Sequence, residues 1–179
     1  DAQTARELLH LLLEQAQTHS VLLFHTWARH YAQVIDTAQA DASPRPAVGL
    51  IKELMITLDS RLIDDDLLQR AQTGAAGWST AEILRARADV LLAADCPVQD
   101  CAAEIILIKA LNVARVQGAL AWELRSATSL ARLWQRQGRD RQARELLSPI
   151  HQRFTEGHAT PDLATAQRLL GELHSHESA

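Results

Sequence analysis

The sequence predicts an all-α protein built as an array of antiparallel helix hairpins. Apolar residues recur with a period near 3.6 from one end of the chain to the other, and alternation of the strand type is nowhere sustained. Glycine and proline together number 12 of 179 residues (7 plus 5), and aromatic residues make up 4%, which disfavours a β-rich fold. Because 47% of the residues are hydrophobic, the chain can bury a sizeable core. We therefore expect one helical-repeat domain over residues 1–179.

The first two hairpins are predicted over residues 5–36 and 47–73. In the first, Leu8, Leu9 and Leu12 form one apolar stripe, and Phe24 and Trp27 begin another. A loop rich in Ala, Ser, Pro and Asp over 40–46 separates the two hairpins. The two helices of the second hairpin nearly abut between Asp59 and Leu62.

A third hairpin is predicted over residues 79–117, with Ser79 as a helix cap and Asp95–Pro97 as the break between its helices. Glu82 can close a capping box with Ser79. The second helix carries the run Ile105–Ile108 and is apolar on nearly every side, so we expect it to pack between neighbours on both flanks.

The fourth hairpin is predicted over residues 121–156, and a capping helix over 160–173. Gly138 separates the two helices of the fourth hairpin, because glycine adopts the left-handed conformation that ends helices. Thr160 and Pro161 form a favourable helix start. The two stripes of this hairpin must face each other, so its core is expected to consist of Leu130, Trp134, Ala143 and Leu147.

Hairpins that recur about every 40 residues are typical of stacked helical repeats. The segment Ala127–Ile150 fits the tetratricopeptide pattern best: Leu130 and Ala131 stand at its Leu-Gly, Trp134 at its Tyr, Gly138 at its turn glycine and Ala143 at its tightly packed small residue. The predicted fold is thus a right-handed superhelical, tetratricopeptide-like array.

The chain also resembles the C-terminal repeat region of large bacterial signal-transduction ATPases. Those proteins place a winged-helix DNA-binding domain or an adenylate/guanylate cyclase domain before a nucleotide-binding module and end in tetratricopeptide-like repeats. The resemblance is strongest from Leu62 to Leu170, and rests on the segments Ala81–Arg85, Leu91–Leu92, Ala110–Leu111, Ala114–Arg115, Gln117–Gly118, Trp122–Trp134, Gly138–Arg139, Ala143–Arg144, Leu146–Leu147, Pro149, Phe154–Gly157 and Thr160–Leu163.

This resemblance implies a non-catalytic interaction or sensor module of a larger regulator of transcription or signalling. Similar proteins carry a further loop and helix where Asp59 and Leu62 nearly meet here, so we expect a break or a missing helix at that place. The chain begins with Asp1 rather than Met, from which we expect it to be part of a longer polypeptide. The alternative is a free-standing tetratricopeptide adaptor that bridges two proteins.

No pattern for catalysis, metal or cofactor is found, and we expect neither enzyme activity nor a cofactor. There is no phosphate-binding Gly-x-x-x-x-Gly-Lys-[Ser/Thr] motif and no His-Glu-x-x-His pair. The consecutive carboxylates Asp64, Asp65 and Asp66 spread around a helix and are expected at a solvated helix start. Cys96 and Cys101 are read as reduced thiols, because no further ligands accompany them.

The charge and the hydropathy also limit the partners that we expect. A formal net charge of -4 gives no general attraction to nucleic acid or to an anionic membrane. No apolar run approaches the ~20 residues of a membrane span. We expect a cytoplasmic module without direct nucleic-acid or membrane contact, whose partner is a protein, a peptide or the ATPase module of the same polypeptide.

The candidate binding residues lie on the first helices of the third and fourth hairpins, which line the concave face in tetratricopeptide arrays. Each set recurs at i+3, i+4 or i+7 and therefore shares one side of its helix. Arginines there would bind an acidic peptide or a carboxylate in bidentate fashion; ordinary solvated surface is the competing interpretation. The candidate residues are Glu82, Arg85, Asp89, Arg125, Thr128, Arg132 and Arg136.

Overall fold

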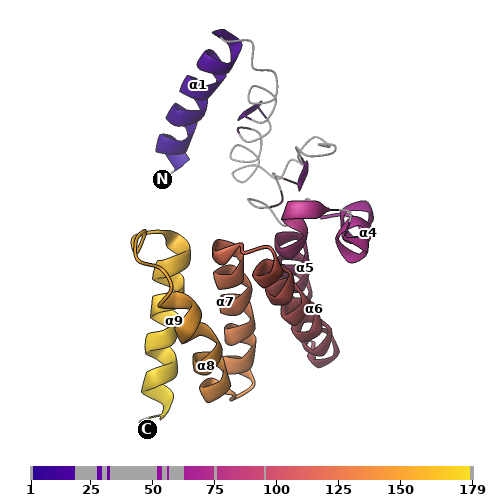
Figure 1. Ribbon diagram of the computed structural model, residues 1–179, viewed down its shortest axis with the longest axis vertical. Coiled ribbons are helices and arrows are strands. Elements are labelled where there is room, and N and C mark those ends of the chain that lie inside the picture. The colour runs from indigo at the N-terminus through magenta and orange to yellow at the C-terminus, as the bar shows by residue number, and fades with distance from the viewer. Residues whose placement is uncertain are drawn as a thin grey trace. The chain divides into compact units, whose positions relative to one another are not determined.

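A computed structural model of the chain describes residues 2–18, 28, 29, 32, 52, 53, 56, 63–74, 76–94 and 96–177. All regular structure in these residues is helical and none of it is strand, which confirms the all-α fold class. The chain divides into two compact units, residues 1–62 and 63–179 (Figure 1).

The unit formed by residues 1–62 is described mainly through its first helix, α1, at Ala2–Thr18. Leu9 and Ala16 are buried, whereas Leu8 and Leu11 are exposed. The second helix predicted for 5–36, most of the first helix predicted for 47–73, and the break predicted between Asp59 and Leu62 lie outside the described residues.

The second unit begins with α4 at Asp65–Thr73, followed by the short 3-10 helix η2 at Gly77–Ser79. The Asp64 carboxylate caps α4 by accepting the Leu67 amide at 3.1 Å, and Asp65 and Asp66 occupy the first turn. This confirms the prediction that the three carboxylates form a helix start. Their negative charges there interact favourably with the positive end of the helix dipole.

Five longer helices follow in the second unit, separated by short turns that make neighbours in the chain antiparallel. They are α5 (Thr80–Leu92), α6 (Pro97–Val116), α7 (Leu120–Arg136), α8 (Asp140–His151) and α9 (Pro161–Glu177). Gly118 and Gly138 have φ of 65° and 71° at the turns after α6 and α7, a conformation in which glycine carries no steric penalty. Thr160 and Pro161 stand at the start of α9, as predicted.

The five helices form two layers. The helices α5 and α7, which begin successive hairpins, and the closing helix α9 contact one another in order, while α6 packs on α5 and α7, and α8 packs on α7 and α9 (Figure 1). The odd-numbered helices therefore present one continuous face, and this face carries the candidate residues.

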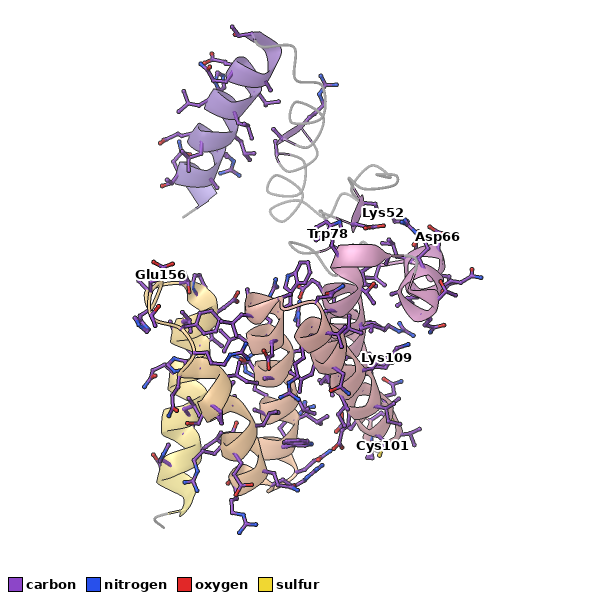
Figure 2. All side chains as sticks on the ribbon, viewed as in Figure 1. Lys52, Asp66, Trp78, Cys101, Lys109 and Glu156 are labelled. Atoms are coloured by element: carbon purple, nitrogen blue, oxygen red, sulfur yellow. The ribbon has the colours of Figure 1, made fainter. Side chains whose placement is uncertain are left out.

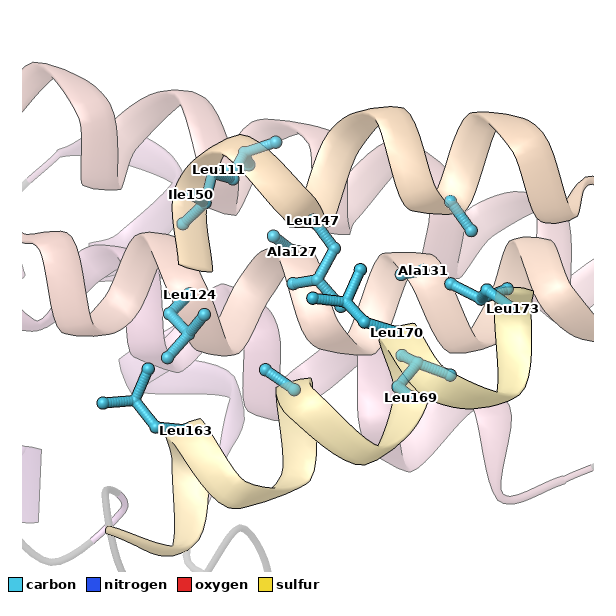
Figure 3. Packing of buried hydrophobic residues seen from close by; sticks show 12 residues of the cluster. Leu111, Leu124, Ala127, Ala131, Leu147, Ile150, Leu163, Leu169, Leu170 and Leu173 are labelled. Carbon is cyan, nitrogen blue, oxygen red and sulfur yellow. The ribbon is translucent and has the colours of Figure 1, made fainter. Parts of the chain in front are cut away.

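Among the described residues, two clusters of buried side chains lie between the layers. One cluster is formed by α6, α7, α8 and α9, and Figure 3 shows how leucines from α9 reach under α7 and α8. The other contains Ala88, Ala103, Leu107, Leu130 and Leu133. Of the expected core residues, Leu130, Ala143 and Leu147 are buried; Trp134 is half-buried and packs against both clusters.

Trp134 is only half-buried because its indole also serves a polar contact. Its Nε1–H donates to Glu104 Oε1 at 2.7 Å, and the guanidinium carbon of Arg139 lies 4.7 Å from the ring centroid. Arg139 Nη1 in turn binds Glu104 Oε1 at 2.8 Å. The indole therefore joins α7 to α6 through its hydrogen bond to Glu104, and the cation–π contact ties it to Arg139 in the turn before α8.

As predicted, the helix containing Ile105–Ile108 packs between two neighbours, since α6 contacts both α5 and α7, but its apolar residues are not all covered. Leu107 is buried, but Ile105 and Ile108 are exposed. The predicted capping box is also absent: Ser79 Oγ donates to the Ala76 carbonyl, and Glu82 binds an arginine instead. In both cases a tertiary contact, or the lack of one, overrides the local pattern.

Candidate functional site: an arginine groove on α5, α7 and α9

Two adjoining depressions lie along the face shared by α5, α7 and α9. Their volumes are ≈ 500 Å³ and ≈ 200 Å³, and both are lined by Ser129, Arg132 and Thr165, so they form one groove. We call it the arginine groove, since its lining includes five arginines: Arg85, Arg125, Arg132, Arg136 and Arg168.

The arginine groove is net positive in a chain of net charge -4. Its five arginines are accompanied by three acidic lining residues, Asp89, Asp162 and Glu172, which leaves a balance of +2 (five minus three). One more carboxylate, Glu82, lies beneath the lining and reduces the local balance to +1. Such a local reversal of sign attracts an anionic group that the rest of the surface repels.

Glu82 organises the end of the groove that is formed by α5 and α7. Its side chain is 0% exposed, and its carboxylate accepts a bidentate pair from Arg85, with Nε to Oε2 at 2.8 Å and Nη2 to Oε1 at 2.7 Å. Arg125 Nη2 also reaches Glu82 Oε1, at 2.9 Å. A buried carboxylate held by two guanidinium groups is compensated for its lost hydration, so it fixes both arginines in place.

The network continues from Arg85 to the exposed rim of the groove. Arg85 Nη1 pairs with Asp89 Oδ2, and Ser129 Oγ donates to Asp89 Oδ1 at 3.1 Å. Arg125 Nε lies 3.9 Å from Asp162 Oδ2, which brings α9 into the same network. The polar face is thus a ladder of ion pairs across three helices that are about 40 residues apart in the chain.

The ion pairs of this ladder stabilise the charged form of Arg85, as the direction of its pKa shift shows. Burial by itself lowers the pKa of the guanidinium, but the hydrogen bonds and charges of Glu82 and Asp89 outweigh burial, and the pKa is raised above its ordinary value. Arg85 therefore stays charged at every physiological pH, and its hydrogen-bonding groups are committed to the fold.

The structure brings six of the seven candidate residues to the lining of the groove: Arg85, Asp89, Arg125, Thr128, Arg132 and Arg136. Glu82 lies beneath them, and the expectation that it meets a partner is corrected, because a side chain without exposed surface cannot do so. Thr128 is 6% exposed, and its hydroxyl donates to the Leu124 carbonyl at 2.8 Å. Arg85 and Arg125 both form ion pairs with Glu82, and Arg85 also pairs with Asp89.

Arg132 differs from the other arginines of the groove. It is exposed, lies where the two depressions meet, and makes no hydrogen bond or ion pair with any residue that the structure describes. Arg136 is held by Asp100 at 3.4 Å, and Arg168 by Glu172 at 4.0 Å. Arg132 is therefore the guanidinium whose five donors remain available to a bound anion.

Sequence reasoning missed the contribution of α9, which it treated only as a cap. Thr165 and Arg168 line the groove from α9, with Asp162 and Glu172 at either end. Gln135 Nε2 of α7 donates to Glu172 Oε2 at 3.4 Å, which closes one end. The signal was present in the sequence, since these four residues recur at i+3, i+3 and i+4 on the face beside the apolar stripe of α9.

The described residues contain no group of three or more His, Cys, Asp or Glu side chains that could hold a metal ion. Cys96 and Cys101 are both free thiols. Within the helices that the structure describes, none has the length and apolar character needed to cross a membrane. Comparison with known proteins finds no family model, no curated protein and no solved structure that matches this chain.

Proposed function

We propose that this chain is the partner-binding module of a larger signal-transduction ATPase regulator, and that the arginine groove binds an acidic segment of a partner or of the regulator's own ATPase module. The two layers of α5 to α9 would be part of a tetratricopeptide-like superhelix, with the groove on its concave face. The module itself carries out no bond chemistry and changes the state of the regulator by binding one conformation better than another.

The observation that carries this proposal is that Arg132 has no ion-pair or hydrogen-bond partner among the described residues. Arg85 and Arg125 both pair with the buried carboxylate of Glu82, and Arg85 also pairs with Asp89, so they shape the groove without offering free charge. Arg132 offers a complete guanidinium beside Thr165 and Ser129, in a cleft of net positive charge. A carboxylate that enters this cleft gains a bidentate, partly desolvated contact, which is stronger than an exposed surface pair.

The groove is tested with a fluorescein-labelled octapeptide of glutamate, about 26 Å long when extended, and a glutamine octapeptide of the same length. We expect the glutamate peptide to bind more tightly, and Arg132→Ala to weaken its binding about tenfold, the loss of one charge-assisted contact. Fluorescence anisotropy over a salt series measures both effects.

Arg141→Ala is the matched control, because Arg141 is an exposed arginine on α8 with only an i,i+4 partner, Glu145, at 3.4 Å. Equal affinity of the Arg132→Ala and Arg141→Ala variants for the glutamate peptide would place the binding site elsewhere. Equal binding of the glutamate and glutamine peptides would remove the argument from charge.

The assignment to an ATPase regulator has its own test in the gene. A reading frame that continues upstream into a phosphate-binding loop supports it, whereas a start codon directly before Asp1 would favour the free-standing adaptor. Both classes of protein would use the arginine groove in the same way, so the peptide experiment and the gene test are independent.

A further inference from the structure

The face of α6 that is turned away from α5 and α7 exposes four large aliphatic side chains. Val98 is 78% exposed, Ile105 70%, Ile108 41% and Val116 89%. Figure 2 labels Cys101 and Lys109 on the same outer side of the helix. Water therefore meets an apolar stripe that runs along the whole of α6, and stripes of this kind mark interaction surfaces.

A groove of ≈ 710 Å³ runs beside this stripe over the C-terminal half of α6. One wall is formed by α6 through Ile105, Ile108, Asn112 and Val116, and the other by the end of α4 and the start of η2. Lys109 is its one charged lining residue, and the opposite wall contributes the small residues Gly74 and Gly77. The groove thus accepts a helix with an apolar face rather than a charged segment.

The four aliphatic residues of the stripe are spaced almost symmetrically about the middle of the helix. Val98 and Val116 have their midpoint at position 107, and Ile105 and Ile108 have theirs at 106.5 (half of 105 plus 108). A two-fold axis perpendicular to the helix near these positions would place each member of the stripe opposite another member. Self-complementarity of this type is what an isologous dimer contact requires.

We propose that this chain forms a homodimer in which α6 packs antiparallel against the α6 helix of a second copy. In an antiparallel pair about this axis, residues whose numbers add up to 213 or 214 lie opposite each other. The partner's Val116 then lies over Val98, the partner's Ile108 over Ile105, and the partner's Cys101 faces Asn112. Lys109 falls beside the partner's Ile105, so its methylene stem covers apolar surface and the two lysines do not oppose each other.

The spacing of the stripe supports helix pairing. The steps from Val98 to Ile105 and from Ile105 to Ile108 are seven and three residues, the intervals by which helices interdigitate along a shared seam. A helix of 20 residues gives a seam about 30 Å long. The N-terminal half of the partner's α6 would occupy the groove beside α4, which adds area to the seam.

The area of one helix pair is at the lower end of specific interfaces, so we expect a dissociation constant on the order of micromolar. The dimer is therefore concentration-dependent. It leaves the arginine groove open, because α6 contributes no residue to that groove. The dimer and the proposed binding function stand on different surfaces and can fail independently.

The oligomeric state of the full 179-residue chain is measured by sedimentation velocity from about 1 to about 100 µM, a range that brackets the expected constant. We expect a shift from monomer to dimer in the native chain. Ile105→Lys should weaken the dimer at least tenfold, because it places a charge in the centre of the seam. Val90→Lys is the matched control, since Val90 is also an exposed aliphatic residue, on α5.

Circular dichroism and urea unfolding establish that each variant keeps the native fold, which we expect because the replaced side chains are exposed. A native chain that stays monomeric over the whole range overturns the proposal. Equal weakening by Ile105→Lys and Val90→Lys overturns the assignment to α6.

The antiparallel direction is tested by cross-linking in a Cys96→Ser background, where Cys101 is the one native thiol that remains. Asn112→Cys should form a covalent dimer with the partner's Cys101 when the thiols are oxidised with diamide. Asn112→Cys combined with Cys101→Ser should not, nor should Gln142→Cys, an exposed position on α8. Ready cross-linking of Cys101 to the partner's Cys101 would indicate parallel helices and contradict the proposed geometry.

Discussion

Glu82 illustrates how one residue can belong to a polar stripe in sequence and to the core in the structure. Its carboxylate lies under the arginine groove, without exposed surface, and joins Arg85 of its own helix to Arg125 of α7. Removing it would leave two guanidinium groups facing a cavity where their counter-charge had been. The residue therefore supports the site from beneath and does not contact a partner.

We predict that Glu82→Ala destabilises the protein by about 3 kcal/mol, because breaking a buried ion pair leaves a charge without compensation. Urea unfolding at neutral pH measures the loss. The control is Glu145→Ala, in which an exposed i,i+4 pair with Arg141 is removed and the expected change is below about 0.5 kcal/mol. A similar small loss for both variants would mean that solvent reaches the Glu82 pair.

Glu104 gives the molecule a pH-dependent contribution to its stability. Burial raises the pKa of this carboxyl, but the Trp134 and Arg139 hydrogen bonds and the Arg139 charge outweigh burial, and the pKa is lowered overall. A lowered folded-state pKa means that the stabilisation is complete above the unfolded-state value of about 4.3 and is lost as the pH falls through the folded-state value.

We predict that Glu104→Gln costs about 1.5 kcal/mol at pH 7, as expected for hydrogen bonds to a charged group. The difference from the native chain should shrink as the pH falls below about 4.3, where the native carboxyl begins to take up its proton. Urea unfolding at a series of pH values records it, with Glu156→Gln as an exposed control. A difference that stays constant into acid would show that the indole contact needs no charge.

At the scale of the element, helix ends are decided locally and helix faces are not. Gly138 ends α7 with φ of 71°, and the turn is closed by the Gly138 amide to the Gln135 carbonyl at 3.0 Å and the Arg139 amide to the Trp134 carbonyl at 2.8 Å. These bonds need a left-handed residue at position 138. The stop is therefore written into the chain at a single position.

Gly138→Ala and Gly171→Ala form a matched pair for this argument, because an added Cβ meets no atom within 4 Å at either site. We predict that Gly138→Ala destabilises the protein by about 1 kcal/mol through its positive φ. Gly171 lies inside α9, and there Ala should stabilise by about 0.5 to 1 kcal/mol through helix propensity. Thermal or urea unfolding distinguishes the two signs; the same sign for both would contradict the conformational explanation.

At the scale of the whole molecule, the division into two units makes the second unit a candidate for independent folding. The two clusters found among the described residues consist wholly of residues from 63–179. The helix α9 contributes five residues to one of these clusters: Leu163, Ala166, Leu169, Leu170 and Leu173. The last helix is thus part of the core that holds α7 and α8 together.

We predict that a fragment of residues 63–179 folds cooperatively, with a helical circular dichroism spectrum and one sigmoidal urea transition. A fragment of residues 63–159, which lacks α9, should lose this cooperativity, because it exposes the leucine cluster of α7 and α8 to water. Broad, non-cooperative unfolding of both fragments would mean that residues 1–62 are required for the core.

Features that depend on local chemistry can be predicted from the amino-acid sequence without the structure. The helical period, the glycine stop at position 138 and the start of α9 at Thr160 and Pro161 could be predicted, because each depends on residues within one or two turns. The polar stripes of α5 and α7 were predicted for the same reason, since residues at i+3, i+4 and i+7 share a helix face whatever the fold. Most of the arginine groove follows from these stripes.

The tertiary structure alone decided which faces are covered and which charges are paired. Glu82 became a buried centre of the ladder because Arg125, 43 positions later (125 minus 82), turns toward it. Within the part of the chain that the structure describes, Arg132 has no partner, and α9 joined the groove, through the order in which the helices stack. The apolar run of α6 stayed exposed on one side because periodicity shows that residues lie together on a face, whereas only packing shows whether another helix covers that face.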